Sequence, residues 1–331
     1  MKKIKVAFTD FWQGFDINNN YFVNILRDKY IVDIITDTRW EETEYLFYSC
    51  FGYEHLKYDC IKIYYTGENL VPDFNLCDYA IGYEHLQYGD RYIRMPLYVI
   101  EYREDFQHML DIRDSIVTRN KFCSFVASNN AEADSTRKDI FTKLSKYKQV
   151  DAGGRYLNNI GCPGGVVDKQ AFQEQYKFSL AIENSSHPGY CTEKIIQAFA
   201  AGTIPIYWGD PLVADYFNEN AFINCHRYRN LDEVVEVVKC IDQDTVRYQT
   251  MLKEKIITDS QQSMQAYDNR FQKWLQNIIE QPLEQAYRRS IYGKEMVYKN
   301  QLKRWIRCEE EYVKYTQRPF IKRLITLIYN K

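Results

Sequence analysis

Residues 177–209 constrain the fold most, because they predict a strand, a loop, a helix and a second strand in immediate succession. The apolar, β-prone run 177–183 predicts a buried strand, and His187-Pro188-Gly189 excludes regular structure in the loop after it. Thr192 is the expected N-cap of the helix, and Gly202 is the residue type that accepts the left-handed conformation at its end. A buried strand over 203–207 follows at once.

The start of this helix is a candidate phosphate site. A helix N-terminus reached from a strand edge presents unpaired N–H groups and the positive end of the dipole, and Lys194 adds a full charge there. Successive helical side chains point about 100° apart, so Glu193 and Lys194 can face a sugar and its diphosphate. The residues alone equally allow an ordinary capped helix with a solvated lysine.

Elsewhere, strand candidates alternate with helical segments, the pattern of parallel sheets with crossover helices. A first unit has strands at 5–8, 32–36, 61–66 and 79–82, with 97–102 as a further candidate. A second unit has strands at 122–128, 177–182, 203–207 and 221–224, and helices at 136–147, 192–201 and 231–242. We place the boundary in the polar run 118–121 and predict an α/β chain with two such units.

Composition excludes several classes of protein. A formal net charge of -2 over 331 residues argues against a nucleic-acid partner, which would call for a strongly basic domain. Nine cysteines without a CxxC pair indicate reduced thiols in a cytosolic protein. The apolar run at residues 4–8 is too short for a signal peptide or a membrane span, so we expect a cytoplasmic protein.

Several blocks of sequence carry a resemblance to a known family. Residues 176–194 and 203–209, together with upstream blocks, resemble the α-1,3/1,4-fucosyltransferases of glycosyltransferase family ten, and the bacterial members most of all. The upstream blocks are 65–69, 77–82, 90–98 and 124–129. They lie in the family's order across residues 61–230, whereas the first and last sixty residues resemble the family much less.

The resemblance implies a GT-B fold, in which two Rossmann-like domains face a central cleft. We expect residues 1–118 to be the acceptor-binding domain, residues 119–285 to be the GDP-fucose-binding domain, and residues 286–331 to form a helical tail.

An inverting sugar transferase needs a base for the acceptor hydroxyl and positive charge for the leaving diphosphate. Glu68 follows the strand ending at residue 66 and matches the family's general base, although a glutamate in such a turn is often simply solvated. Glu84 and His85 end another strand of the same domain. Related bacterial members carry two acids there, and His85 departs from that pattern, so we take Glu84 and His85 as acceptor contacts rather than as the base.

On the donor side, the resemblance places a phosphate-binding arginine at Arg137, which on sequence alone also fits a surface position. Lys194 completes the phosphate clamp, and Glu193 favours the positive charge that develops on the fucose ring. The other predicted donor contacts are Ser128 and Asn129 for phosphate or ribose, Asn184 and Tyr190 for the sugar, and Thr192.

No cofactor is expected. With Arg137 and Lys194 on the diphosphate, the chemistry does not require a divalent metal, and no histidine pair has ligand spacing. Asp242-Gln243-Asp244 matches a D-x-D metal motif but follows a helix end, so we interpret it as a helix cap and loop.

The tail has a composition of its own. Residues 313–331 contain no acid, and lysines and arginines alternate with apolar residues after Pro319. This pattern indicates a basic amphipathic helix that either lies on an anionic membrane surface or packs against the catalytic domains.

Together these features predict an inverting fucosyltransferase that moves L-fucose from GDP-fucose to the 3-hydroxyl of GlcNAc or glucose in a β-galactoside, giving Lewis-type glycans. Two alternatives remain: the same fold with another deoxy- or amino-sugar nucleotide or acceptor position, and a glycan-binding protein without turnover.

Overall fold

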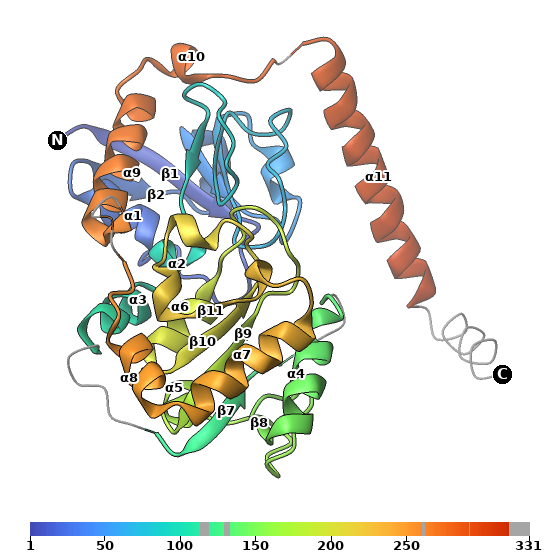
Figure 1. Ribbon diagram of the computed structural model, residues 1–331. Coiled ribbons are helices and arrows are strands. Elements are labelled where there is room, and N and C mark those ends of the chain that lie inside the picture. Colours follow the sequence, from blue (N-terminus) through green and yellow to red (C-terminus); the bar gives the residue numbers. More distant parts are fainter. Residues whose placement is uncertain (113–118, 129–132, 258, 260–261, 291, 318–331) are drawn as a thin grey trace.

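The computed structural model describes residues 1–112, 119–128, 133–257, 259, 262–290 and 292–317, which form two parallel β-sheets with helices around them (Figure 1). Every strand pair in both sheets is parallel. Parallel neighbours need crossover connections, and most of these contain a helix. The predicted α/β architecture with two such units is confirmed.

The first sheet has the strand order β2-β1-β3-β4-β5-β6. Its strands are β1 (Lys3–Thr9), β2 (Ile31–Ile34), β3 (Tyr45–Tyr48), β4 (Ile61–Tyr65), β5 (Tyr79–Gly82) and β6 (Tyr92–Arg94). Its helices are α1 (Tyr21–Arg27), α2 (Leu97–Ile100) and α3 (Arg103–Asp111), with 3-10 turns η1 (Asp37–Glu42) and η2 (Glu54–Lys57).

One predicted strand is wrong. Residues 97–102 were expected to be extended, but Leu97–Ile100 form helix α2, which begins directly after Pro96. Tyr98, Val99 and Ile100 are all buried. A short apolar run buried on several sides has no period that separates strand from helix. The β3 and β6 strands were not predicted.

The second sheet has the order β11-β10-β9-β7-β8. Its strands are β7 (Lys121–Phe125), β8 (Val150–Ala152), β9 (Tyr176–Ile182), β10 (Ile204–Trp208) and β11 (Ile223–Asn224). Its helices are α4 (Thr136–Tyr147), α5 (Lys169–Gln173), α6 (Glu193–Ala200), α7 (Leu231–Gln243) and α8 (Thr245–Lys253), with turns η4 (Val213–Asp215), η5 (Glu219–Ala221) and η6 (Cys225–Arg227).

The predicted strand–loop–helix–strand unit is present as β9, α6 and β10. Gly202 has φ +64, the left-handed conformation predicted for the residue that ends the helix. Residues 204–208 pair in register with 178–182, so both strands direct their carboxyl ends toward the same edge of the sheet.

The last helices connect the two units. α9 (Met264–Ile279) follows the second unit in sequence but packs on the first, beside α1 in Figure 1. Trp274 Nε1 donates to the Asp90 carbonyl at 2.8 Å, and Asp268 pairs with Arg103 at 2.7 Å. One hydrophobic core therefore contains residues of both units.

Beyond α10 (Leu283–Ala286), α11 (Lys294–Thr316) runs along the outside of the molecule and buries none of its residues (Figure 1). Most of the predicted basic helix, residues 318–331, lies outside the described residues. In the described part of the chain, no helix combines the length and apolar character of a membrane span.

Candidate active site

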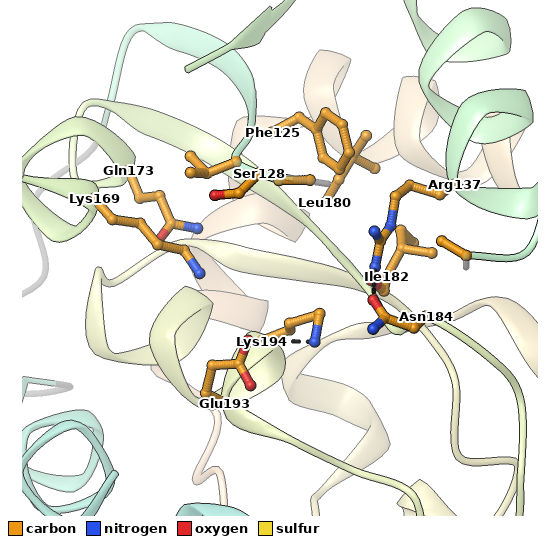
Figure 2. A pocket seen from close by; sticks show the side chains of 13 residues that line it. Phe125, Ser128, Arg137, Lys169, Gln173, Leu180, Ile182, Asn184, Glu193 and Lys194 are labelled. Carbon is orange, nitrogen blue, oxygen red and sulfur yellow. Dashed lines mark hydrogen bonds and ion pairs between the residues drawn. The ribbon is translucent and has the colours of Figure 1, made fainter. Parts of the chain in front are cut away.

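The second unit contains a cavity of about 330 Å³ at the carboxyl ends of β7 and β9 and beside the first turns of α4 and α6 (Figure 2). Ligands of open parallel sheets bind at such an edge. The cavity is lined by Phe125, Val126, Ala127, Ser128, Ala133, Arg137, Lys169, Gln173, Leu180, Ile182, Asn184, Glu193 and Lys194. Five of the residues predicted for the donor site are among them, whereas Asn129 lies outside the described residues.

Lys194 is fixed by a buried carboxylate that the sequence did not reveal. Its Nζ lies 2.7 Å from Glu183 Oε2 and 3.2 Å from Glu193 Oε1. Glu183 is fully buried and also accepts hydrogen bonds from the backbone N–H and the hydroxyl of Thr192. Its only sequence signal was a charged residue at the end of an apolar strand.

Thr192 stands at the predicted N-cap position of α6, but its hydroxyl makes no capping bond. It donates to Glu183 Oε2 at 2.7 Å instead, and the Thr192 backbone N–H donates to Oε1 of the same carboxyl group. The threonine thus helps to hold the pair of Glu183 and Lys194 at the start of the helix.

The charges around α6 keep both of its first side chains ionised. Burial raises the pKa of Glu193, but Lys194 and Lys169 outweigh it and lower that pKa to about 2. Burial lowers the pKa of Lys194, but Glu183 and Glu193 outweigh it, and the net direction is upward. The cavity therefore has a carboxylate and an ammonium group side by side.

Lys169 and Gln173 are cavity residues of α5 that sequence reasoning missed. Burial lowers the pKa of Lys169, whose Nζ donates to Gln197 Oε1 at 2.6 Å. Gln173 is buried, and its Oε1 has no hydrogen-bond partner among the described residues.

Arg137 comes from the first turn of α4 and is 3% exposed. Its Nη2 donates to the Ile182 carbonyl at 3.0 Å and to Asn184 Oδ1 at 2.6 Å, so the guanidinium is held over the end of β9 (Figure 2). Burial lowers the pKa of Arg137, and the guanidinium still stays charged at neutral pH. Arg137, Lys169 and Lys194 together place three cations around one cavity.

Glu68 lies where the first unit meets the second. It is exposed in the loop after β4, and the next residue, Asn69, donates to Ser185 Oγ of the second unit at 2.5 Å. Burial and Glu183 raise the pKa of Tyr190, and the negative charge of Glu68 contributes in the same direction. The Tyr83 hydroxyl donates to Asn69 Oδ1, and the Tyr83 ring packs on Tyr190 at 5.2 Å. Tyr190 is buried and does not line the cavity.

Glu84 and His85 both pair across the two units. The Glu84 carboxylate lies 2.9 Å from His187 Nε2, and His85 Nε2 shares a hydrogen bond with the Tyr216 hydroxyl. Burial and the neighbouring Arg94 charge lower the pKa of His85.

The D-x-D sequence has the capping role expected of it. Asp244 accepts the Arg247 N–H at 2.9 Å as the N-cap of α8, and Asp242 pairs with Lys177 at 2.8 Å. Within the described ranges, no three His, Cys, Asp or Glu side chains gather as a metal site.

Two parallel α/β units, with a cation-lined cavity at the strand ends of the second, have the arrangement of the GT-B class of glycosyltransferases. Residues 6–101 match the family model described as "Alpha-(1,3)-fucosyltransferase FucT N-terminal domain". Residues 116–294 match the family model described as "Glycosyltransferase family 10 (fucosyltransferase) C-term". The chain belongs to glycosyltransferase family 10, the fucosyltransferases, as its sequence blocks indicated.

The relatives support this assignment. The chain is 33% identical over 291 residues to the alpha-(1,3)-fucosyltransferase FucT of Helicobacter pylori, covering 76% of this chain and 60% of that protein. It is similar to a crystal structure of an alpha1,3-fucosyltransferase, with TM-score 0.70, 30% identity and coverage of 83% of this chain and 91% of that one. It is also similar to a crystal structure of an alpha1,3-fucosyltransferase with GDP-fucose, with TM-score 0.68, 30% identity and coverage of 84% of this chain and 92% of that one.

Proposed function

We propose that this protein transfers L-fucose from GDP-fucose to the 3-hydroxyl of a GlcNAc or glucose residue in a β-galactoside, with inversion at the anomeric carbon. The observation that supports this most is the cavity in which Arg137, Lys169 and Lys194 surround the ionised Glu193. This charge pattern suits a diphosphate joined to a sugar that becomes cationic during transfer. A relative of similar fold and 30% identity has been solved with GDP-fucose.

In the proposed mechanism, the bond between the fucose anomeric carbon and the diphosphate oxygen breaks while the acceptor oxygen bonds to the opposite face of that carbon. Arg137, Lys169 and Lys194 stabilise the charge left on GDP. Glu193 stabilises the positive charge on the fucose ring, and Glu68 takes the proton from the acceptor hydroxyl. Because three side-chain cations face the diphosphate, we propose that no divalent metal is needed.

The test is GDP release from GDP-fucose with N-acetyllactosamine, with lactose and without acceptor, all in EDTA. Release that depends on acceptor supports the donor, the acceptor class and the metal independence together. Binding of GDP without release with either disaccharide would contradict the acceptor class and turn attention to other acceptors and nucleotide sugars. Binding of glycan without GDP-sugar and without turnover would favour a glycan-binding protein.

We also propose a cellular location, and the argument for it comes from the sequence alone. We propose a cytoplasmic enzyme whose basic residues in 313–331 contact an anionic membrane surface peripherally, where lipid-linked glycans would be presented.

A further inference from the structure

The first unit contains a second cavity, of about 360 Å³, formed where the loop after β1 enters α1. Its lining combines six aromatic side chains and Ile100 with a few polar side chains. The residues are Trp12, Gly14, Phe15, Asp16, Asn19, Asn20, Tyr21, Phe22, Tyr65, Ile100, Glu101 and Tyr102.

The aromatic rings of this loop are ordered against one another. Phe11 and Phe15 stack with centroids 3.9 Å apart, and the Trp12 ring stands nearly perpendicular to Phe15 at 5.2 Å. Trp12 and Phe15 are only half-buried, so part of their surface remains available. A pyranose has an apolar C–H face that packs on such rings, while its hydroxyls need acceptors and donors at the edge, as Asp16 and Asn19 provide.

The lining of this cavity differs in charge from the lining of the donor cavity. None of the described residues that line it is a lysine or arginine, whereas the donor cavity has three cations. A phosphate group therefore has no counter-charge here, and an uncharged glycan is the ligand that fits.

Glu101 contributes a carboxyl group to the aromatic cavity. It lies at the cavity wall and accepts a hydrogen bond from the buried Tyr65 hydroxyl at 2.5 Å. Although the residue is exposed overall, burial of its carboxyl raises its pKa to about 7, and the charges of Glu193 and Glu68 act in the same direction. Glu101 lies between α2 and α3, and a hydrogen bond of 2.8 Å from Gln197 Nε2 to Asp105 Oδ2 joins α3 to α6, the helix that carries Glu193 and Lys194.

We propose that the aromatic cavity of residues 12–22 is the acceptor subsite, where a sugar ring of the β-galactoside stacks on Trp12 and Phe15 and donates a hydroxyl hydrogen bond to Glu101. This inference rests on the proposed function and adds the place and the contacts of the acceptor. It makes Trp12 and Phe15 specificity residues.

The test compares Trp12→Ala with Trp40→Ala, a tryptophan on η1 that does not line the cavity. Initial rates are measured with varied N-acetyllactosamine and varied GDP-fucose, and GDP affinity is measured by calorimetry. We expect the acceptor KM of Trp12→Ala to rise about tenfold or more, the size of effect that loss of one stacking contact produces. GDP affinity should stay within about twofold, and Trp40→Ala should leave both constants unchanged.

A second variant keeps the test decisive if Trp12→Ala unfolds. Glu101→Gln preserves shape, so we expect it to raise the acceptor KM and to remove an ionisation near pH 7 from the pH profile of kcat/KM for acceptor. If wild type transfers fucose while both folded variants keep the wild-type acceptor KM, the subsite is wrong and the proposed function stands. If wild type fucosylates neither N-acetyllactosamine nor lactose, the proposed acceptor class falls, and the subsite falls with it.

Discussion

At the scale of single residues, Lys194 has two roles, one in the stability of the fold and one in the proposed binding of the donor. It neutralises the buried Glu183 and also faces the donor cavity. Removing one partner of a buried ion pair costs about 3–5 kcal/mol, because the other charge is left unpaired. Lys177 offers a comparison, since it pairs with Asp242 away from the cavity, where Lys148 is a second partner of that carboxylate.

We therefore predict that Lys194→Met lowers the free energy of unfolding by about 2–4 kcal/mol, and that Lys177→Met lowers it by less, because Lys148 and the Tyr147 hydroxyl still contact Asp242. Only Lys194→Met should also weaken GDP binding, by about a hundredfold, because it removes a phosphate cation. Urea denaturation and calorimetry with GDP measure the two effects. Equal loss of GDP affinity in both variants would mean that the effect is one of stability alone.

Glu68 gives a prediction about catalysis. Its carboxylate is exposed and is not among the residues that line the donor cavity, so Glu68→Gln should leave GDP affinity nearly unchanged. As the proposed base it should lower kcat by at least about a hundredfold. Substantial residual transfer would move the role of base to Glu84, His85 or Glu101.

Lys62 gives a prediction about pH and stability. It is 1% exposed on β4, and burial, followed by the Arg289 and Lys299 charges, lowers its pKa to about 7. Between about pH 7 and pH 10.5, Lys62 is therefore protonated in a larger fraction of unfolded chains than of folded chains. The free energy of unfolding consequently rises with pH over this range.

Lys62→Met should accordingly stabilise the protein, and the gain should shrink by up to about 1.4 kcal/mol per pH unit above pH 7. Urea denaturation at pH 7.5 and 9.5 measures it. The exposed Lys273→Met serves as control and should show no such trend. A gain that is constant with pH would contradict the inferred titration.

At the scale of elements, the loop after β8 forms part of the support of the donor cavity. A Cβ on Gly154 would lie 2.1 Å from the Ala127 carbonyl oxygen and 2.5 Å from its backbone nitrogen. Ala127 lines the cavity, so the backbone of this wall would have to move.

We predict that Gly154→Ala lowers the free energy of unfolding by about 2–4 kcal/mol and weakens GDP binding at least about tenfold. Gly164→Ala, in the loop that follows, is the matched control because its Cβ would meet nothing within 4 Å. Thermal unfolding and GDP calorimetry report both properties. Unchanged GDP affinity in folded Gly154→Ala would show that the wall accommodates the shift.

Some elements could be predicted from local sequence patterns alone, and others could not. The β9–α6–β10 unit was predictable, because a strand, a Pro-Gly loop, a cap position and a terminal glycine all agreed. Helix α2 was not, since its four residues are buried and show no period. The β6 strand was also missed, because three residues carry too short a pattern.

At the scale of the whole molecule, α11 contributes nothing to the cores of the two units. α11 buries no residue and contacts the first unit through few bonds, such as Tyr298 to Asp73 and Lys299 to Asp59. The catalytic units therefore do not depend on it for their core.

We predict that a chain ended after Arg318 keeps transfer to soluble acceptor but loses binding to vesicles that contain phosphatidylglycerol. Co-sedimentation with anionic and with neutral vesicles checks this. The neutral vesicles control for apolar adsorption. Unchanged binding to anionic vesicles would exclude the tail as the contact, and a large loss of activity would indicate that it packs on the catalytic units.

The sequence by itself determined the family, the parallel α/β class and the start of α6 after β9, because these depend on local patterns of apolar residues, caps and charges. Only the tertiary structure decided that Glu183 holds Lys194, that Lys169 and Gln173 join the cavity, and that α9 returns to the first unit. Those contacts join residues of different elements, and no local sequence pattern indicates them. Their proximity follows from the way the two sheets and their crossover helices pack.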